Sequence, residues 1–179
     1  SLVSVYVDGD LPGAQQLGSR FKVRGYPTVI LMNADGAEIS RLPGSADAPQ
    51  VMAVLQAGLS GGRPIRAVLA DARGGKALSA NEWRMLAFHG WEVDEDQLVP
   101  AADRPLVLAD LARRGATAGA DAETVTRLWL KALGASDDGK GIKPDPALRE
   151  RVQRVLDDPA LARVHMDVVT SQADDIVKV

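Results

Sequence analysis

Strand signals are confined to about the first third of the sequence and stop at the glycine pair Gly61-Gly62. Before this pair, β-branched and apolar residues alternate between glycine-containing turns, a pattern typical of short strands with helices between them. After it, apolar residues recur at helical spacing. We therefore predict an α/β part at residues 1–62 and an all-α part at residues 63–179.

The first part is predicted to run strand, helix, hairpin, helix. The opening VSVYVDGD predicts a strand, and Gly13–Phe21 predicts a short helix. In RGYPTVILMNADGAE, the apolar run Val29–Leu31 predicts a strand buried on both faces, and Asp35-Gly36 predicts the tight turn of a hairpin. Pro27 belongs at the first position of that strand, because proline cannot donate to a β-ladder. Asp47 is the expected N-cap of the helix that follows.

The second part carries six amphipathic stretches without a signature at constant period, which favours an irregular helical bundle over a solenoid. Several helix starts are marked by capping residues. Ser79-x-x-Glu82 is a capping box, Asp121 and Asp145 are N-cap candidates, and Pro159 starts the last helix. Four residues are predicted to be buried in the core of this part: Trp129, Leu133, Val152 and Val155.

The composition excludes several classes of function. Hydrophobic residues make up 46% of the 179 residues, while the net charge of -3 and the lack of a clustered basic patch argue against binding to nucleic acid or an anionic membrane. No apolar run approaches the roughly 18 residues that cross a bilayer. There is no cysteine, and therefore no disulfide, thiolate metal site or thiol nucleophile. This absence assigns no compartment, and the bacterial periplasm and the cytoplasm are both compatible with it.

The order of these signals resembles the C-terminal half of a thioredoxin-like fold. In that family a strand and a helix lead to a loop that ends in a cis-proline, and a hairpin and a last helix follow. The matching text is VSVYVDGD, then LGSRFKVRGYPTVILMNADGAEISRLPG, then APQVMAVLQAGLS. Arg41 and Gly44 also match the end of the second hairpin strand. The resemblance covers about the first third of the chain and implies a partial thioredoxin-like fold joined to a helical accessory domain.

The resemblance also implies a substrate-binding position. In thioredoxin-like proteins, the residue before the cis-proline offers backbone hydrogen bonds to an extended substrate peptide. Carried over to this sequence, Tyr26 becomes the backbone peptide-binding residue and Pro27 the cis-proline, so the Tyr26-Pro27 bond is predicted to be cis. The alternative is that Pro27 only shapes the loop and that Tyr26 fills a pocket.

The family's catalytic motif, Cys-x-x-Cys, is absent from this sequence. A thiolate must attack the substrate disulfide, and no other side chain replaces its sulfur. We therefore assign no catalytic residue, no cofactor site and no metal ligand. The leading hypothesis is a fragment of a thioredoxin-like thiol–disulfide oxidoreductase, redox-inactive alone, whose Cys-x-x-Cys half would precede Ser1 and whose partner is a protein or peptide substrate.

Two alternatives stay open. One is a non-enzymatic peptide- or protein-interaction module with a degenerate thioredoxin-like domain. The other, ranked lower, is a glutathione transferase-like protein, a family that usually follows this hairpin turn with Glu-Ser, whereas here Asp35-Gly36 leads to AEISRLPG. In each case an incomplete sheet has unpaired edges, which predicts that the first strand pairs onto the hairpin or that the chain forms a homo-oligomer.

The remaining polar motifs favour structural roles. His89 lies beside Trp91 at a helix end, which favours capping or packing over metal binding, and His165 is expected to be partly exposed on the last helix. The acidic stretch Glu92–Gln97 lacks the spacing of a calcium loop and is predicted to be a solvated linker. Ser136–Asp145 lacks the spacing of a phosphate-binding loop and is predicted to be a flexible turn.

Overall fold

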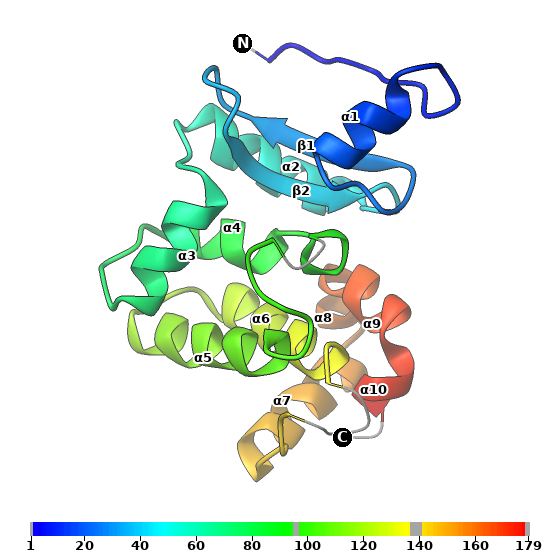
Figure 1. Ribbon diagram of the computed structural model, residues 1–179. Coiled ribbons are helices and arrows are strands. Elements are labelled where there is room, and N and C mark those ends of the chain that lie inside the picture. The colour runs from blue at the N-terminus through cyan, green and yellow to red at the C-terminus, as the bar shows by residue number, and fades with distance from the viewer. Residues whose placement is uncertain (1, 95–96, 137–140, 178–179) are drawn as a thin grey trace.

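A two-stranded antiparallel sheet lies at one end of the molecule, and helices make up the rest (Figure 1). The computed structural model describes residues 2–94, 97–136 and 141–177. Within these residues the elements are α1 (Ala14–Arg20), β1 (Thr28–Met32), β2 (Glu38–Pro43), α2 (Ala48–Leu59), α3 (Ile65–Arg73), α4 (Ala80–Phe88), the 3-10 helix η1 (Trp91–Val93), α5 (Arg104–Thr117), α6 (Ala122–Gly134), α7 (Pro146–Asp157), α8 (Pro159–Val164), α9 (Met166–Ser171) and α10 (Ala173–Val177).

The hairpin forms where the sequence predicts it. The turn between β1 and β2 places Gly36 at a φ of 78°, and Asn33 Oδ1 accepts hydrogen bonds from the N–H groups of Asp35 and Ala37 at 3.1 and 2.8 Å. The short polar side chain and the glycine thus build the turn locally. Helix α2 packs against the hairpin and begins at the predicted N-cap Asp47, whose carboxylate accepts the Gln50 N–H at 2.9 Å.

The prediction that β1 is buried on both faces is wrong. Val29 is 48% exposed and Leu31 is only partly buried. The buried strand is instead β2, in which Ile39 and Leu42 are both sealed from solvent. The reason is that α2 contacts both strands, whereas β2 is also covered by η1 and α3 of the helical part.

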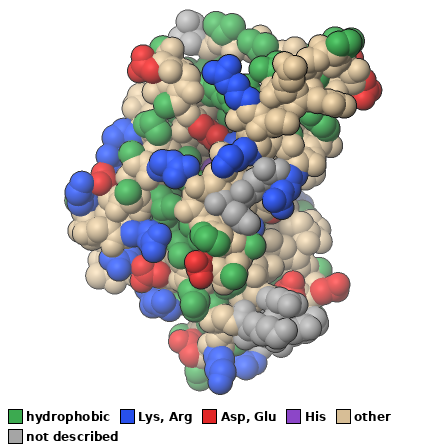
Figure 2. Space-filling view, in the orientation of Figure 1, with side chains coloured by type: hydrophobic (Ala, Val, Ile, Leu, Met, Phe, Trp, Pro, Cys, Tyr) green, Lys and Arg blue, Asp and Glu red, His purple; other side chains and the backbone are tan. Residues whose placement is uncertain are grey.

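The prediction of a strand at the start of the chain is also wrong for the described residues. Residues 2–7 adopt no regular structure and do not pair with the hairpin. Val3 and Tyr6 are 87% and 88% exposed. Figure 2 shows hydrophobic side chains along the upper edge of the molecule, where Figure 1 places this segment. An apolar alternation predicts a strand only if a neighbour completes its ladder, and no described strand lies beside this segment.

The part after Gly62 is helical, and its described residues contain no β-strand. The predicted caps are confirmed: Ser79 and Glu82 form a capping box, and Asp121 and Asp145 each accept a backbone N–H at 2.8 Å. The last predicted helix is instead broken into α8, α9 and α10. The first break falls at His165, whose side chain turns into the interior.

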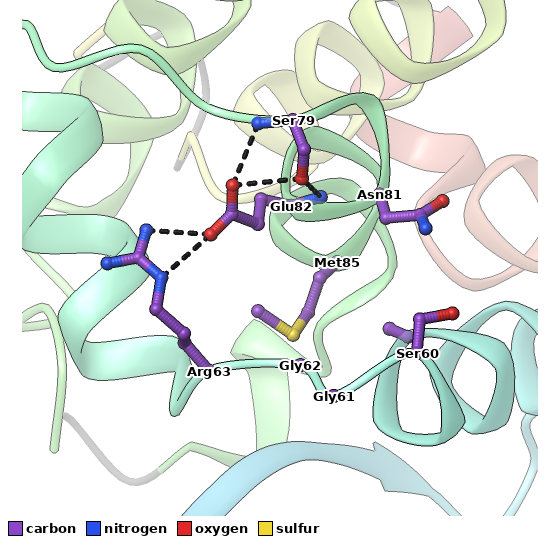
Figure 3. A pocket seen from close by; sticks show the side chains of 9 residues that line it. Ser60, Gly61, Gly62, Arg63, Ser79, Asn81, Glu82 and Met85 are labelled. Carbon is purple, nitrogen blue, oxygen red and sulfur yellow. Dashed lines mark hydrogen bonds and ion pairs between the residues drawn. The ribbon is translucent and has the colours of Figure 1, made fainter.

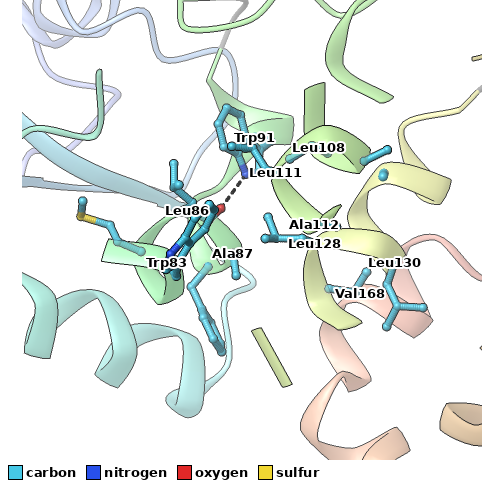
Figure 4. Packing of buried hydrophobic residues seen from close by; sticks show 14 of the residues in the cluster. Trp83, Leu86, Ala87, Trp91, Leu108, Leu111, Ala112, Leu128, Leu130 and Val168 are labelled. Carbon is cyan, nitrogen blue, oxygen red and sulfur yellow. Dashed lines mark hydrogen bonds between the residues drawn. The ribbon is translucent and has the colours of Figure 1, made fainter. Parts of the chain in front are cut away.

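One hydrophobic core extends from Ile39 in β2 to Ile176 in α10, and Figure 4 shows a part of it around Trp91 and Leu128. It includes the fully buried Trp91, whose indole N–H donates to the carbonyl oxygen of Leu86 at 2.9 Å. Of the four residues predicted to be buried in the helical part, three are buried as expected: Leu133, Val152 and Val155. Trp129, the fourth, is only partly buried, because it lies at the margin of the core with the Arg113 guanidinium 5.7 Å from its ring centroid. The proposed domain boundary at residue 62 stays a prediction.

Candidate peptide-binding loop and its buried support

The loop between α1 and β1 ends at a cis peptide bond between Tyr26 and Pro27, as predicted. The Pro27 carbonyl oxygen accepts the Gly44 N–H at 2.7 Å, and the Thr28 hydroxyl donates to the Gly25 carbonyl oxygen at 2.6 Å. A Cβ at Gly44 would lie 2.0 Å from Pro27 Cγ. Glycine is therefore required at position 44, since any side chain there would displace the proline.

Tyr26 and Pro27 are both exposed. The Tyr26 ring lies against two glycines, because a Cβ at Gly9 would be 3.2 Å from Tyr26 Cζ and a Cβ at Gly18 would be 2.8 Å from the hydroxyl oxygen. The side chain is nevertheless 64% exposed, so it does not fill a closed pocket. Within the described residues, no hydrogen bond engages the backbone N–H or C=O of Tyr26. The exposed Tyr26 backbone therefore has no hydrogen-bond partner within the described part of the chain.

The start of the loop is fixed by the C-terminus of α1. The Val23 N–H donates to the Gly18 carbonyl oxygen at 2.8 Å and the Lys22 N–H to that of Ser19 at 3.2 Å, the bonding pattern of a Schellman motif. Lys22 occupies the left-handed position of this motif with a φ of 50°. A residue with a Cβ costs about 1 kcal/mol there, so the surrounding structure must hold it in place.

Arg41 in β2 supplies that support from the interior. Its side chain is fully buried and donates two hydrogen bonds to the Glu38 carboxylate at 2.7 Å each. It also donates to the carbonyl oxygens of Phe21, Lys22 and Val93 at 3.0, 3.2 and 3.0 Å. The carboxylate offsets the buried charge. The guanidinium thus joins the end of α1 to η1 in the helical part.

Ser40, His89 and Asp94 form a buried hydrogen-bonded chain. His89 Nδ1 lies 3.0 Å from Ser40 Oγ and 3.5 Å from the Arg41 backbone N, and Nε2 lies 3.3 Å from Asp94 Oδ1. Because the Arg41 N–H can only donate, we assign the ring proton to Nε2. The order of groups is that of a nucleophilic triad, but all three side chains are sealed from solvent, so no substrate reaches Ser40. These hydrogen bonds link Ser40 in β2 to His89 and Asp94 in the helical part.

Asp94 corrects the prediction of a solvated linker at Glu92–Gln97. It is buried and also accepts the Leu98 N–H at 2.9 Å, while residues 95–96 lie outside the described residues. Burial acts to raise the pKa of the Asp94 carboxyl, but the hydrogen bonds from His89 and Leu98 outweigh it and hold that pKa below its usual value. The predicted packing or capping role of His89 is confirmed, since it is the buried C-cap of α4.

A second buried polar cluster joins α2, α6 and α9. The Asp167 carboxylate accepts hydrogen bonds from both Arg127 and Gln50, and the Arg127 guanidinium lies 4.1 Å from the Phe88 ring centroid. His165 lies near this pair and is fully buried, so the prediction of partial exposure is wrong. Neither of its ring nitrogens has a hydrogen-bond partner among the described residues. Burial first, and then the Arg127 charge, lower the pKa of His165 to about 4.

Lys131 is buried between these two clusters. Its ammonium donates to the His89 carbonyl oxygen at 2.6 Å, and burial lowers its pKa to about 8. The predicted turn Ser136–Asp145 is described only at its ends, because residues 137–140 lie outside the described residues. Ser136 and Ile142 are both buried, so the ends of this segment pack against the core.

A small cavity of about 150 Å³ lies where α2 and α4 meet (Figure 3). Its charged side chains are paired: Arg63 forms ion pairs with Glu82 at 2.6 Å and with Asp71 at 2.6 Å, and Glu82 also accepts the Ser79 N–H at 2.7 Å. Met85 forms part of its lining. The cavity contains neither Tyr26 nor Pro27, and its charged groups are already paired.

Comparison with known proteins agrees with the sequence resemblance. Residues 3–59 match the family of thioredoxin-like domains. No curated protein and no solved structure matches the chain. The chain therefore contains a partial thioredoxin-like fold, comprising α1, the cis-proline loop, the hairpin and α2, followed by a helical region. Among the described residues, no helix has the length and apolar character required to cross a membrane.

The sequence indicated the loop but not its support. Tyr26 and Pro27 were found through the resemblance, whereas the roles of Arg41, His89 and Asp94 depend on contacts between residues about 50 positions apart. One local signal existed for Arg41, because it stands between apolar residues in ISRLP, the stretch that forms β2. A charged residue inside a buried strand requires a partner, and Glu38 lies three residues earlier.

Proposed function

We propose that this chain is part of a thioredoxin-like thiol–disulfide oxidoreductase, in which the Tyr26–Pro27 loop holds an extended segment of a protein substrate. The observation that carries this proposal is the exposed loop itself. Its two ends are fixed by hydrogen bonds, while the Tyr26 backbone makes none within the described residues and can pair with a peptide. The thioredoxin-like match over residues 3–59, which includes this loop, supports the same role.

The chain alone is redox-inactive in this proposal. Reduction of a substrate disulfide begins when a thiolate attacks one sulfur, forms a mixed disulfide and releases the other sulfur as a thiolate. The sequence contains no cysteine to perform this attack. The nucleophile therefore belongs to a Cys-x-x-Cys segment outside these 179 residues, and the contribution of this chain is to bind and orient the substrate.

Peptide binding is tested with an extended peptide and its matched analogue, methylated on a single central backbone nitrogen. Methylation removes one N–H but also adds bulk, so the control peptide is methylated on the neighbouring nitrogen, whose N–H points to the opposite side of an extended peptide. We expect a loss of about tenfold in affinity for one such hydrogen bond. Equal affinity of the two methylated peptides would contradict the proposed use of the Tyr26 backbone.

The redox proposal is tested by insulin reduction. The chain alone is expected to give no turnover, and the chain joined to an upstream thioredoxin-like half with Cys-x-x-Cys is expected to be active. The control replaces both cysteines of the joined segment with serine. Turnover by the cysteine-free chain would contradict the chemical argument.

A non-enzymatic interaction module is the second candidate. The absence of cysteine favours it, because the binding loop is complete while the chain has no thiol. Peptide binding without any gain of activity after the cysteine segment is restored would select this candidate. In either case, the exposed apolar segment at residues 2–7 and the edge of β1, which no described strand pairs, support self-association as a property of the isolated chain.

A further inference from the structure

Arg41 connects the candidate peptide-binding loop with the helical region. The carbonyl oxygens of Phe21 and Lys22 lie at the C-terminus of α1, where no further helical N–H is available to them and where the helix dipole favours a positive charge. Arg41 donates to both. Its planar guanidinium carries five N–H donors in a fixed arrangement, which the three donors of a lysine ammonium do not reproduce.

These contacts act on the strained end of the loop. Lys22 holds its left-handed conformation directly before the four residues that lead to Pro27. Beyond the proline, Gly44 and Thr28 already fix the strand end of the loop. The position of the C-terminal end of α1 therefore depends on Arg41. The orientation of the Tyr26 backbone depends in turn on the position of this helix end.

The same arginine is held by the segment from His89 to Asp94. The Gly90 N–H donates to the Arg41 carbonyl oxygen at 2.8 Å, and the Val93 carbonyl oxygen accepts from the guanidinium at 3.0 Å. A Cβ at Gly90 would lie 2.9 Å from the Arg41 carbonyl oxygen, so the two backbones are in close contact. Asp94 fixes this segment through its bonds to His89 and Leu98.

We infer that Arg41 is a positioning residue through which the helical region controls the conformation of the Tyr26–Pro27 loop. The functional meaning of this inference rests on the proposed peptide-binding role of the loop. The effect of Arg41 on the conformation of the loop does not depend on that role. A displacement of the segment from His89 to Asp94 removes the Val93 contact, and the guanidinium then loses the orientation in which it holds Phe21 and Lys22.

Hydrogen exchange measured by mass spectrometry tests the first half of the inference. Arg41→Met is expected to accelerate exchange of the hydrogen-bonded amides of Phe21, Lys22 and Val23 by about tenfold more than exchange in α5 and α6, whose acceleration reports only the loss of global stability. Arg41→Lys, which keeps the charge, should accelerate exchange less than Arg41→Met does. It replaces Arg41→Met in this test if the methionine variant does not fold. The control is Arg154→Met, which removes an exposed pair with Glu150. Equal acceleration along the whole chain, or none at residues 21–23, would overturn the inference.

A double-variant cycle tests the coupling. Asp94→Asn retains only one of the two hydrogen bonds that Asp94 accepts, and it lies far from the loop in sequence. It should accelerate exchange at residues 21–23 in the wild-type chain and add nothing to the effect of Arg41→Met. If its effect persists undiminished in the double variant, Arg41 does not carry the coupling. Exchange is measured without peptide. If the chain fails to bind peptide, the proposed function is wrong, but the exchange result still tests the role of Arg41.

Discussion

The buried imidazole of His165, which has no hydrogen-bond partner among the described residues, makes the stability of the protein dependent on pH. His165 lies at the junction of α8 and α9, with the charged groups of Arg127 and Asp167 as its electrostatic neighbours. Its pKa falls from an ordinary 6.5 to about 4 in the folded chain. Above pH 6.5 the ring is neutral in both the folded and the unfolded state, so the group then contributes no dependence on pH.

Between pH 6.5 and 4 the unfolded chain binds a proton at His165 and the folded chain does not, so stability falls as the pH falls. A pKa difference of one corresponds to about 1.36 kcal/mol, and the difference between 6.5 and about 4 therefore costs about 3 kcal/mol of unfolding free energy by pH 4. Below pH 4 the folded chain is protonated as well, and the loss due to His165 levels off.

The assay is urea unfolding at several pH values between 7 and 4 for the wild type and His165→Leu. Leucine is similar in volume and does not titrate, so the variant should lose about 3 kcal/mol less than the wild type over this range. Depressed carboxyl groups such as Asp94 contribute equally to both proteins and cancel in the difference. Val168→Ala is the control, since it removes buried apolar volume from α9 at every pH. Parallel curves for the wild type and His165→Leu would refute the reasoning.

Two further predictions concern packing. Gly44→Ala should lower the unfolding free energy by about 1–3 kcal/mol, because its Cβ would overlap the proline ring at 2.0 Å, whereas Gly25→Ala meets nothing within 4 Å and should be tolerated. Denaturant midpoints decide between them, and equal midpoints would contradict the predicted clash. Trp91→Ala should cost about 3–5 kcal/mol, and the partly buried Trp129→Ala clearly less, by the same measurement. Equal losses would place Trp129 in the core.

Features that depend on neighbouring residues were predictable from the sequence. The turn at Gly36, the N-cap Asp47 and the capping box that begins at Ser79 are each built from side chains and backbone groups within a few positions of one another. Their chemistry is local, so the residue types suffice to identify them. The same applies to the helical spacing after Gly62, which correctly predicts a helical region although not the breaks in its last helix.

Features that depend on distant segments were not predictable. The pattern of residues 2–7 is that of a strand, yet a strand exists only beside another strand, and none of the described strands is its neighbour. The pattern of Val29–Leu31 does not reveal that one side of β1 stays open. The burial of Asp94 and His165 likewise results from packing between elements that are distant in the sequence. The residues adjacent to them in the sequence do not indicate this burial.

The abrupt change of sequence pattern at Gly61-Gly62 does not coincide with a break in the packing. Apolar residues on both sides of the glycine pair belong to one cluster, and Arg41 binds Val93 across it. We therefore predict that the thioredoxin-like part and the helical region unfold in one cooperative transition. Calorimetry should give a van't Hoff enthalpy equal to the calorimetric enthalpy, and Arg41→Met should lower the midpoint without splitting the transition. Two resolved transitions in the wild type would show that the parts are energetically independent, because a shared core and a buried cross-boundary arginine require their stabilities to be linked.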